Sequence, residues 1–179
     1  MSKSHKLLAH TNQLMSQSQH SGPLVSGLSP SSQLVALRRL VTQRFPRLYV
    51  CLHTFPSMTF EPESFNGHIE YKRTLANCSE RRIQEYATQM QWRIMENIKH
   101  QYAIYYIGID DDGTIIGLDT DSIISSIEHF IEIAQSISAS LTGINLIEIV
   151  GDDSVLPRLI ILKIGVKIKK QAEICPILC

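Results

Sequence analysis

The chain has 179 residues, a mass of 20.2 kDa and 17 basic side chains against 17 acidic ones. This length fits one globular domain, and a hydrophobic content of 44% excludes a wholly disordered or collagen-like chain. A net charge of zero gives the whole protein no field that would attract nucleic acid or an anionic membrane. No apolar run approaches the roughly 18 residues that a membrane-spanning helix needs.

The N-terminal third of the chain differs in charge from the rest. Residues 1–60 contain six Lys and Arg side chains and no Asp or Glu, so every acid lies further along. Residues 1–33 are rich in Ser, Gln and His and bury too little apolar surface to offset the entropy of ordering, which predicts a disordered tail. An acid-free, Arg-bearing N-terminus is also typical of mitochondrial transit peptides. We expect a cytoplasmic protein, with the mitochondrion as the alternative.

A short structured segment is expected at residues 34–64. Leu34, Leu37 and Val41 follow helical spacing up to Pro46, a brief strand follows at 48–52, and prolines then open a linker. An α+β domain is predicted at 65–170 and a C-terminal tail at 171–179.

The predicted domain begins with an alternating strand at 68–75, in which Glu70 and Lys72 face away from the apolar side. Ser79 is expected to cap a helix. Its core-facing stripe is Ile83, Ala87, Met90, Ile94 and Ile98, while Arg93 faces elsewhere.

The middle of the domain is expected to be a buried strand followed by a tight turn. Residues 102–109 are almost continuously apolar, which predicts a central strand covered on both faces. Asp110, Asp111, Asp112 and Gly113 predict a turn, with 114–118 returning as a hairpin partner.

A second helix, capped by Asp119 or Thr120, is expected before two further strands at 144–150 and 159–168, with Gly143 in the preceding loop. Lys163 and Lys167 indicate that the last strand is a solvated edge. The resulting order is strand–helix–strand–strand–helix–strand–strand. It predicts an α+β fold, a mixed sheet with two helices packed on one face.

Two groups of residues could form a metal-binding or catalytic site. Asp110, Asp111 and Asp112 offer three carboxylates to a metal, but Asp and Gly are also the residues that a solvated turn prefers, and we favour the turn. Glu70 and Lys72 have the E-x-K spacing of metal-dependent nucleases, where carboxylates hold the metal and a lysine stabilises phosphate charge. A cross-strand ion pair explains that spacing equally well. We therefore assign no catalytic residue and no metal site, and keep Glu70 and Lys72 as the alternative.

Three segments together resemble a known family. Residues 67–72 read Gly-His-Ile-Glu-Tyr-Lys, residues 87–93 read Ala-Thr-Gln-Met-Gln-Trp-Arg, and residues 105–113 contain Ile-Gly-Ile-Asp-Asp-Asp-Gly. In this order they resemble the domain that precedes the GTPase domain in the GTP-binding protein 1 and 2 family of elongation-factor-like translational GTPases. The resemblance covers roughly residues 66–165. The family's phosphate loop, G-x-x-x-x-G-K-S/T, is absent from this chain, so GTP and magnesium are implied only for full-length members.

The resemblance implies a non-catalytic or truncated relative that acts by interaction in translation or mRNA surveillance. Its expected partners are a GTPase core, the ribosome or RNA-decay factors. No cofactor and no membrane contact is expected. The alternative is a Schlafen-like or AlbA-like nucleic-acid-binding domain or RNA nuclease, whose layout is similar, with Glu70 and Lys72 at its centre. A stand-alone domain and a fragment of a longer GTPase both remain open.

Overall fold

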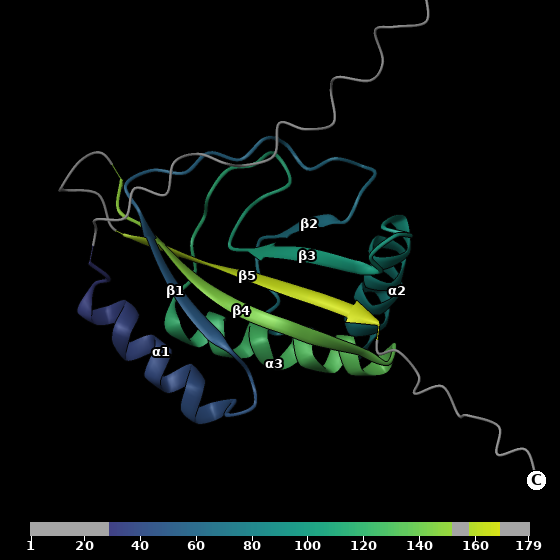
Figure 1. Ribbon diagram of the computed structural model, residues 1–179, viewed down its shortest axis with the longest axis horizontal. Coiled ribbons are helices and arrows are strands. Elements are labelled where there is room, and N and C mark those ends of the chain that lie inside the picture. Colours follow the sequence, from purple (N-terminus) through teal and green to yellow (C-terminus); the bar gives the residue numbers. More distant parts are fainter. Residues whose placement is uncertain (1–28, 152–157, 169–179) are drawn as a thin grey trace, which may run out of the picture.

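The computed structural model describes residues 29–151 and 158–168. Within them the chain forms a five-stranded mixed sheet with three helices (Figure 1), which confirms the predicted α+β class. Residues 1–28 of the tail predicted at 1–33 and the tail predicted at 171–179 lie outside the described residues, while Ser32 and Gln33, placed in the tail, begin the first helix. The elements are α1 (Ser32–Arg44), β1 (Val50–Phe55), β2 (Ile69–Lys72), α2 (Glu80–Glu96), β3 (Tyr102–Ile107), α3 (Thr120–Ser136), β4 (Ala139–Ile149) and β5 (Leu159–Ile168).

The strands lie in the order β1-β4-β5-β3-β2. β1 pairs parallel to β4 and β2 pairs parallel to β3, while β5 runs antiparallel to both of its neighbours. The predicted edge position of the last strand is therefore wrong, because β5 is the middle strand of the sheet. Lys163 and Lys167 therefore do not lie at an edge of the sheet. They alternate with buried residues along β5 and lie on one side of the sheet.

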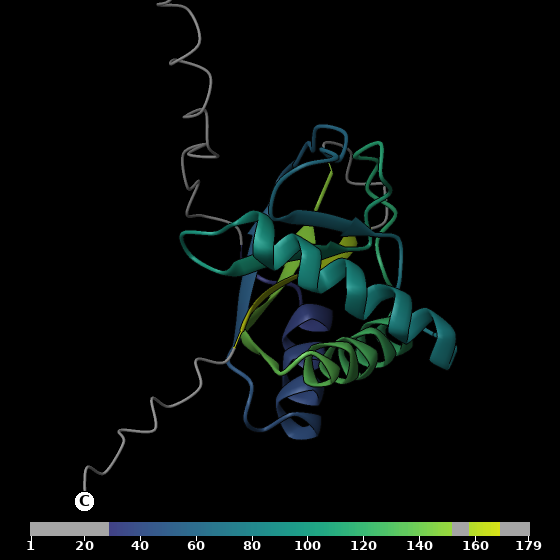
Figure 2. The same cartoon turned by 90° about the vertical axis from the view of Figure 1, so that its right-hand side faces the viewer.

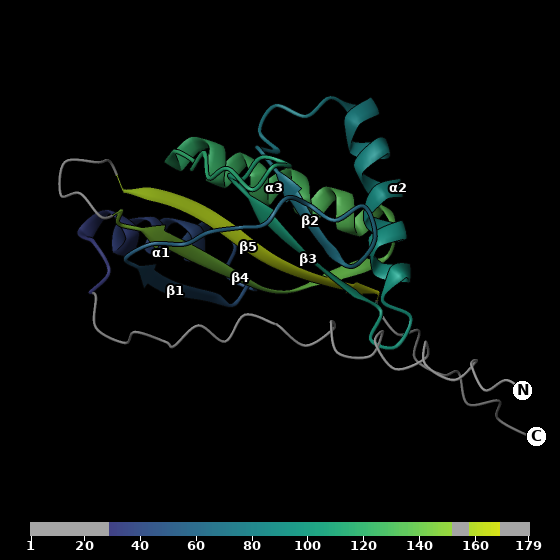
Figure 3. The same ribbon diagram turned by 90° about the horizontal axis from the view of Figure 1, so that it is seen from above.

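All three helices pack on the same side of the sheet (Figures 2 and 3). The two helices predicted to pack on the sheet are α2 and α3, and the helix predicted before Pro46, α1, packs there as well. The segment at 34–64 thus contributes its helix and its strand to the same sheet and the same core as the rest. Phe130 of α3 lies at the centre of this core, fully buried, with its ring at 5.1 Å from that of Tyr105.

The helix starts follow the predicted caps. The Ser79 hydroxyl accepts the N–H of Arg82 at 3.4 Å, and the Asp119 carboxylate accepts the N–H of Ser122 at 2.7 Å. Asp119, not Thr120, is therefore the cap of α3. The end of α2 differs from the prediction: the helix stops at Glu96, and Ile98, expected in the buried stripe, is 84% exposed.

Two loops cover the upper end of the other side of the sheet in Figure 1: the segment between β1 and β2, and the loop after β3. They enclose a smaller apolar cluster that includes Tyr71, Tyr106 and Phe60. The predicted hairpin strand at 114–118 is wrong. A single bridge joins Ile109 to Ile115. The N–H groups of Ile116 and Gly117 both donate to the Gly108 carbonyl, and the N–H of Leu118 donates to β5, so the pairing does not continue as a strand.

Strand β4 begins earlier than predicted. It starts at Ala139, so Gly143 lies inside the strand and not in a loop, next to an irregularity in its pairing with β5.

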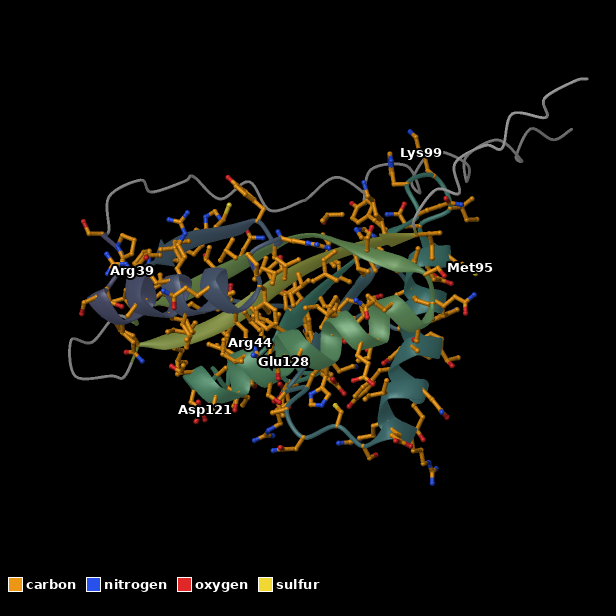
Figure 4. All side chains as sticks on the ribbon, turned by 90° about the horizontal axis from the view of Figure 1, so that it is seen from below. Arg39, Arg44, Met95, Lys99, Asp121 and Glu128 are labelled. Carbon is orange, nitrogen blue, oxygen red and sulfur yellow. The ribbon has the colours of Figure 1, made fainter. Side chains whose placement is uncertain are left out.

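On the helix side, Arg44 of α1 and Glu128 of α3 form an exposed ion pair at 2.8 Å, which is visible from below in Figure 4. Among the described helices, none is long and apolar enough to cross a membrane.

Candidate functional site

Glu70 and Lys72 lie on β2, at the edge of the sheet, and both face the helices. The prediction that they face outward is wrong, since Glu70 is fully buried beneath α2. One carboxylate oxygen of Glu70 accepts a hydrogen bond from the ammonium of Lys72, and the other accepts one from Nε of Arg93. Both oxygens of the carboxylate are therefore occupied by cationic donors.

Arg93 of α2 is the centre of this group. It was expected to face away from the core, yet only 2% of it is exposed. Its Nη2 donates to Glu63 at 2.5 Å, and its Nη1 donates to the backbone carbonyls of Ser64, Phe65 and Gly67 at 2.9–3.2 Å. A buried guanidinium needs this many acceptors, because an unpaired buried charge is expensive.

Glu63 lies in the segment between β1 and β2 and joins that segment to the strand. Its second oxygen accepts the N–H of Tyr71, and its own N–H donates to the Asp111 carbonyl at 2.7 Å. Burial raises the pKa of Glu63, and the Tyr71 N–H opposes that effect. We call Glu63, Glu70, Lys72 and Arg93 the buried ion network.

The buried ion network has a structural role. Its ion pairs and hydrogen bonds join α2, β2 and the segment before β2 at one edge of the sheet. Within the described residues, no group of three or more His, Cys, Asp or Glu side chains is placed to hold a metal ion. The nearby Tyr105 hydroxyl is buried without a hydrogen-bond partner among those residues, and burial raises the pKa of Tyr105.

The sequence carried little signal for the burial of Arg93. Its position directly before Ile94 of the core stripe puts it at the margin of the buried side of the helix. Helical spacing alone placed Arg93 on the polar side. In the folded protein β2 packs against that side of α2, and such a tertiary contact cannot be predicted from the spacing of residues within the helix.

The three aspartates form the predicted turn. Gly113 donates its N–H to the Asp110 carbonyl at 2.9 Å with a φ of 89°. The Asp112 carboxylate accepts the N–H of Thr114 at 2.8 Å, which lowers the pKa of Asp112, and Asp110 pairs with Arg73. Each of these contacts stabilises the turn.

On the side of the sheet opposite the helices, the described residues leave part of the surface accessible. This part, which we call the open face, has ten residues. They are Tyr49, Cys51, Tyr102, Ile104, Thr142, Gly143, Asn145, Lys163, Gly165 and Lys167. Nine of them line a shallow hollow of about 290 Å³.

A pair of glycines forms the floor of this hollow. Gly143 of β4 and Gly165 of β5 are direct partners across the two strands, so no side chain rises from either position. The Thr142 hydroxyl leans over Gly165, where an added Cβ would approach it to 2.3 Å. Asn145 stands at the next position along β4, and its amide is held by His53 at 3.0 Å.

Aromatic rings gather at one end of the open face. The His68 ring lies 5.0 Å from that of Tyr102, and the His100 ring lies 6.1 Å from it. Burial and the neighbouring His100 lower the pKa of His68. The spacing of the histidines in the sequence matches no motif. His68 and His100 come together because the strands that follow them, β2 and β3, pair in parallel.

The comparisons with known proteins agree with a relation to GTP-binding proteins over part of the chain. No protein-family model matches. The chain is 47% identical over 128 residues to the uncharacterized protein R625 of Acanthamoeba polyphaga mimivirus, covering 72% of this chain and 64% of that protein. It is 36% identical over 97 residues to GTP-binding protein 2 of Homo sapiens and of Mus musculus, covering 54% of this chain and 16% of theirs.

The predicted resemblance is thereby confirmed in its coarser form, as a partial similarity to GTP-binding protein 2. The chain spans less than two thirds of the length of each of these relatives.

Proposed function

We propose that this chain is a non-catalytic binding domain related to elongation-factor-like GTPases, acting by interaction in translation or mRNA surveillance in the cytoplasm. The similarity to GTP-binding protein 2 supports the relation, and it concerns 16% of that protein. The expected partners are a GTPase core, the ribosome or RNA-decay factors.

The open face is the observation that carries the proposal of a binding role. Most of the sheet is enclosed by helices on one side and loops on the other, yet here a hollow with a glycine floor is accessible. A central sheet surface that the described residues leave uncovered offers backbone and side-chain groups to a partner. The buried ion network, by contrast, uses its charges within the fold.

A nucleotide titration tests the non-catalytic part of the proposal. We expect the purified chain to show no magnesium-dependent binding of fluorescent GTP up to roughly 100 µM, which corresponds to a binding free energy weaker than about −5.5 kcal/mol. The reason is that the sequence has no G-x-x-x-x-G-K-S/T segment to surround the phosphates. An elongation-factor GTPase domain serves as the positive control, and micromolar, magnesium-dependent binding by this chain would contradict the proposal.

A further inference from the structure

We propose that the open face binds single-stranded RNA, with phosphates against Lys163 and Lys167 and bases over the glycine floor. This inference rests on the proposed function for its choice of RNA, because a domain acting in translation or mRNA surveillance meets RNA. The recognition chemistry itself comes from the charges, rings and shape of the open face.

The charge of the open face suits a polyanion. Among its ten residues the two ionic side chains are lysines, and none is a carboxylate. Lys163 and Lys167 stand on the same side of β5, four residues and thus about 13 Å apart. The chain has a second group of exposed bases on and just after α1, so the test must separate the two; they are Arg38, Arg39, Arg44 and Arg47.

Lys163 is also positioned beside an aromatic ring. Its ammonium lies 5.5 Å from the centre of the Tyr106 ring, and β4 presents Asn145 directly opposite it across the strands. A lysine whose ammonium lies over an aromatic ring is oriented before a ligand arrives. It contributes a phosphate contact at a low cost in side-chain entropy.

Flat rings at the two ends of the hollow can stack on bases. Tyr49 is 73% exposed and lies at the β1 end, and Tyr102 lies at the β3 end beside two histidine rings. Stacking of a base on an aromatic side chain is tolerant of sequence, because every base has a π-face.

The glycine floor keeps the centre of the open face low. No side chain rises from Gly143 or Gly165, although the Thr142 hydroxyl lies over Gly165, so a planar base can approach the two strands between the tyrosines. The Thr142 hydroxyl at its margin can donate to and accept from base edges or a 2′-hydroxyl, whereas the Asn145 amide is bonded to His53 and to the Lys163 carbonyl.

The test is fluorescence anisotropy with the full chain and a labelled single-stranded RNA of about 12 nucleotides, a length within the range of single-strand sites. We expect a dissociation constant of about 1–10 µM at roughly 50 mM salt, weakening steeply as salt rises. The double variant Lys163→Gln/Lys167→Gln should bind about tenfold more weakly and lower the salt slope by about 1.4, because each of two single-strand phosphate contacts contributes about 0.7. Tyr49→Ala should cost about fivefold or more through lost stacking.

Matched controls lie outside the open face. Arg39→Gln/Arg44→Gln on α1 removes the same charge from exposed positions (Figure 4), and Phe65→Ala removes another exposed ring. Both should bind RNA within twofold of the unaltered chain. Tyr49 is exposed, so loss of RNA binding in Tyr49→Ala does not reflect unfolding.

Three results would overturn the inference: no RNA binding at roughly 50 mM salt, equal losses in the α1 control, or tighter binding of DNA of the same sequence. A protein partner that is lost in the Lys163→Gln/Lys167→Gln variant, without RNA binding, would overturn RNA as the ligand and leave the proposed binding function in place. GTP binding would instead overturn the proposed function and say nothing against RNA on the open face.

Discussion

Replacing Arg93 with alanine is expected to destabilise the fold by about 3–5 kcal/mol, the cost of removing one partner from a buried ion pair. Arg93 neutralises both Glu63 and Glu70, and its loss leaves Lys72 as the one cation of the buried ion network. It also removes the donor that holds three backbone carbonyls of the segment before β2. Urea unfolding, followed by circular dichroism, measures this change.

Arg81→Ala is the matched control for that experiment. Arg81 lies on the same helix and also pairs with a glutamate, Glu85, but its side chain is 88% exposed. An exposed pair of this spacing contributes about 0.3–0.5 kcal/mol. Equal, small effects of Arg93→Ala and Arg81→Ala would show that the buried ion network does not stabilise the fold.

Replacing Gly113 with alanine is expected to cost more than about 2 kcal/mol, for two reasons that add. The φ of 89° is one that alanine adopts only with strain, worth about 1–3 kcal/mol. In addition, the new Cβ would stand 2.2 Å from the Phe60 carbonyl oxygen, so the loop after β3 and the segment after β1 would have to separate. The free energy of unfolding in urea is again the measurement.

Gly67→Ala separates these two causes. Gly67 has a φ of 114°, but nothing lies within 4 Å of the position that the new methyl group would take. We expect Gly67→Ala to show the conformational cost alone and Gly113→Ala to exceed it. If Gly113→Ala and Gly67→Ala have the same free energy of unfolding, the segment at Phe60 moves away from the new Cβ without loss of stability.

The local elements of this fold follow from the sequence, whereas their arrangement in the sheet does not. Ser79 and Asp119 marked helix starts because capping depends on residues three positions apart. The middle place of β5, and the pairing of β1 with β4, depend on contacts between residues 10 to 94 positions apart, for which spacing and propensity carry no signal.

In the candidate sites, too, the local residue pattern could be predicted from the sequence and the tertiary contacts could not. The E-x-K pair was visible in the sequence, but its burial was not, since the neutralising Arg93 comes from another element and the helical pattern placed it on the polar side. The open face was not visible at all. Its floor exists because Gly143 and Gly165 are partners in register, and a shift of one residue in that pairing would remove it.

The central claim is that this domain is non-catalytic and that Glu70 is structural. Incubation of labelled single-stranded RNA with the full chain and Mg²⁺ or Mn²⁺, analysed by gel electrophoresis, tests it most directly. We expect intact RNA from both the unaltered chain and Glu70→Gln, because both oxygens of Glu70 are held by Arg93 and Lys72. Metal-dependent cleavage that disappears in a folded Glu70→Gln variant would contradict it.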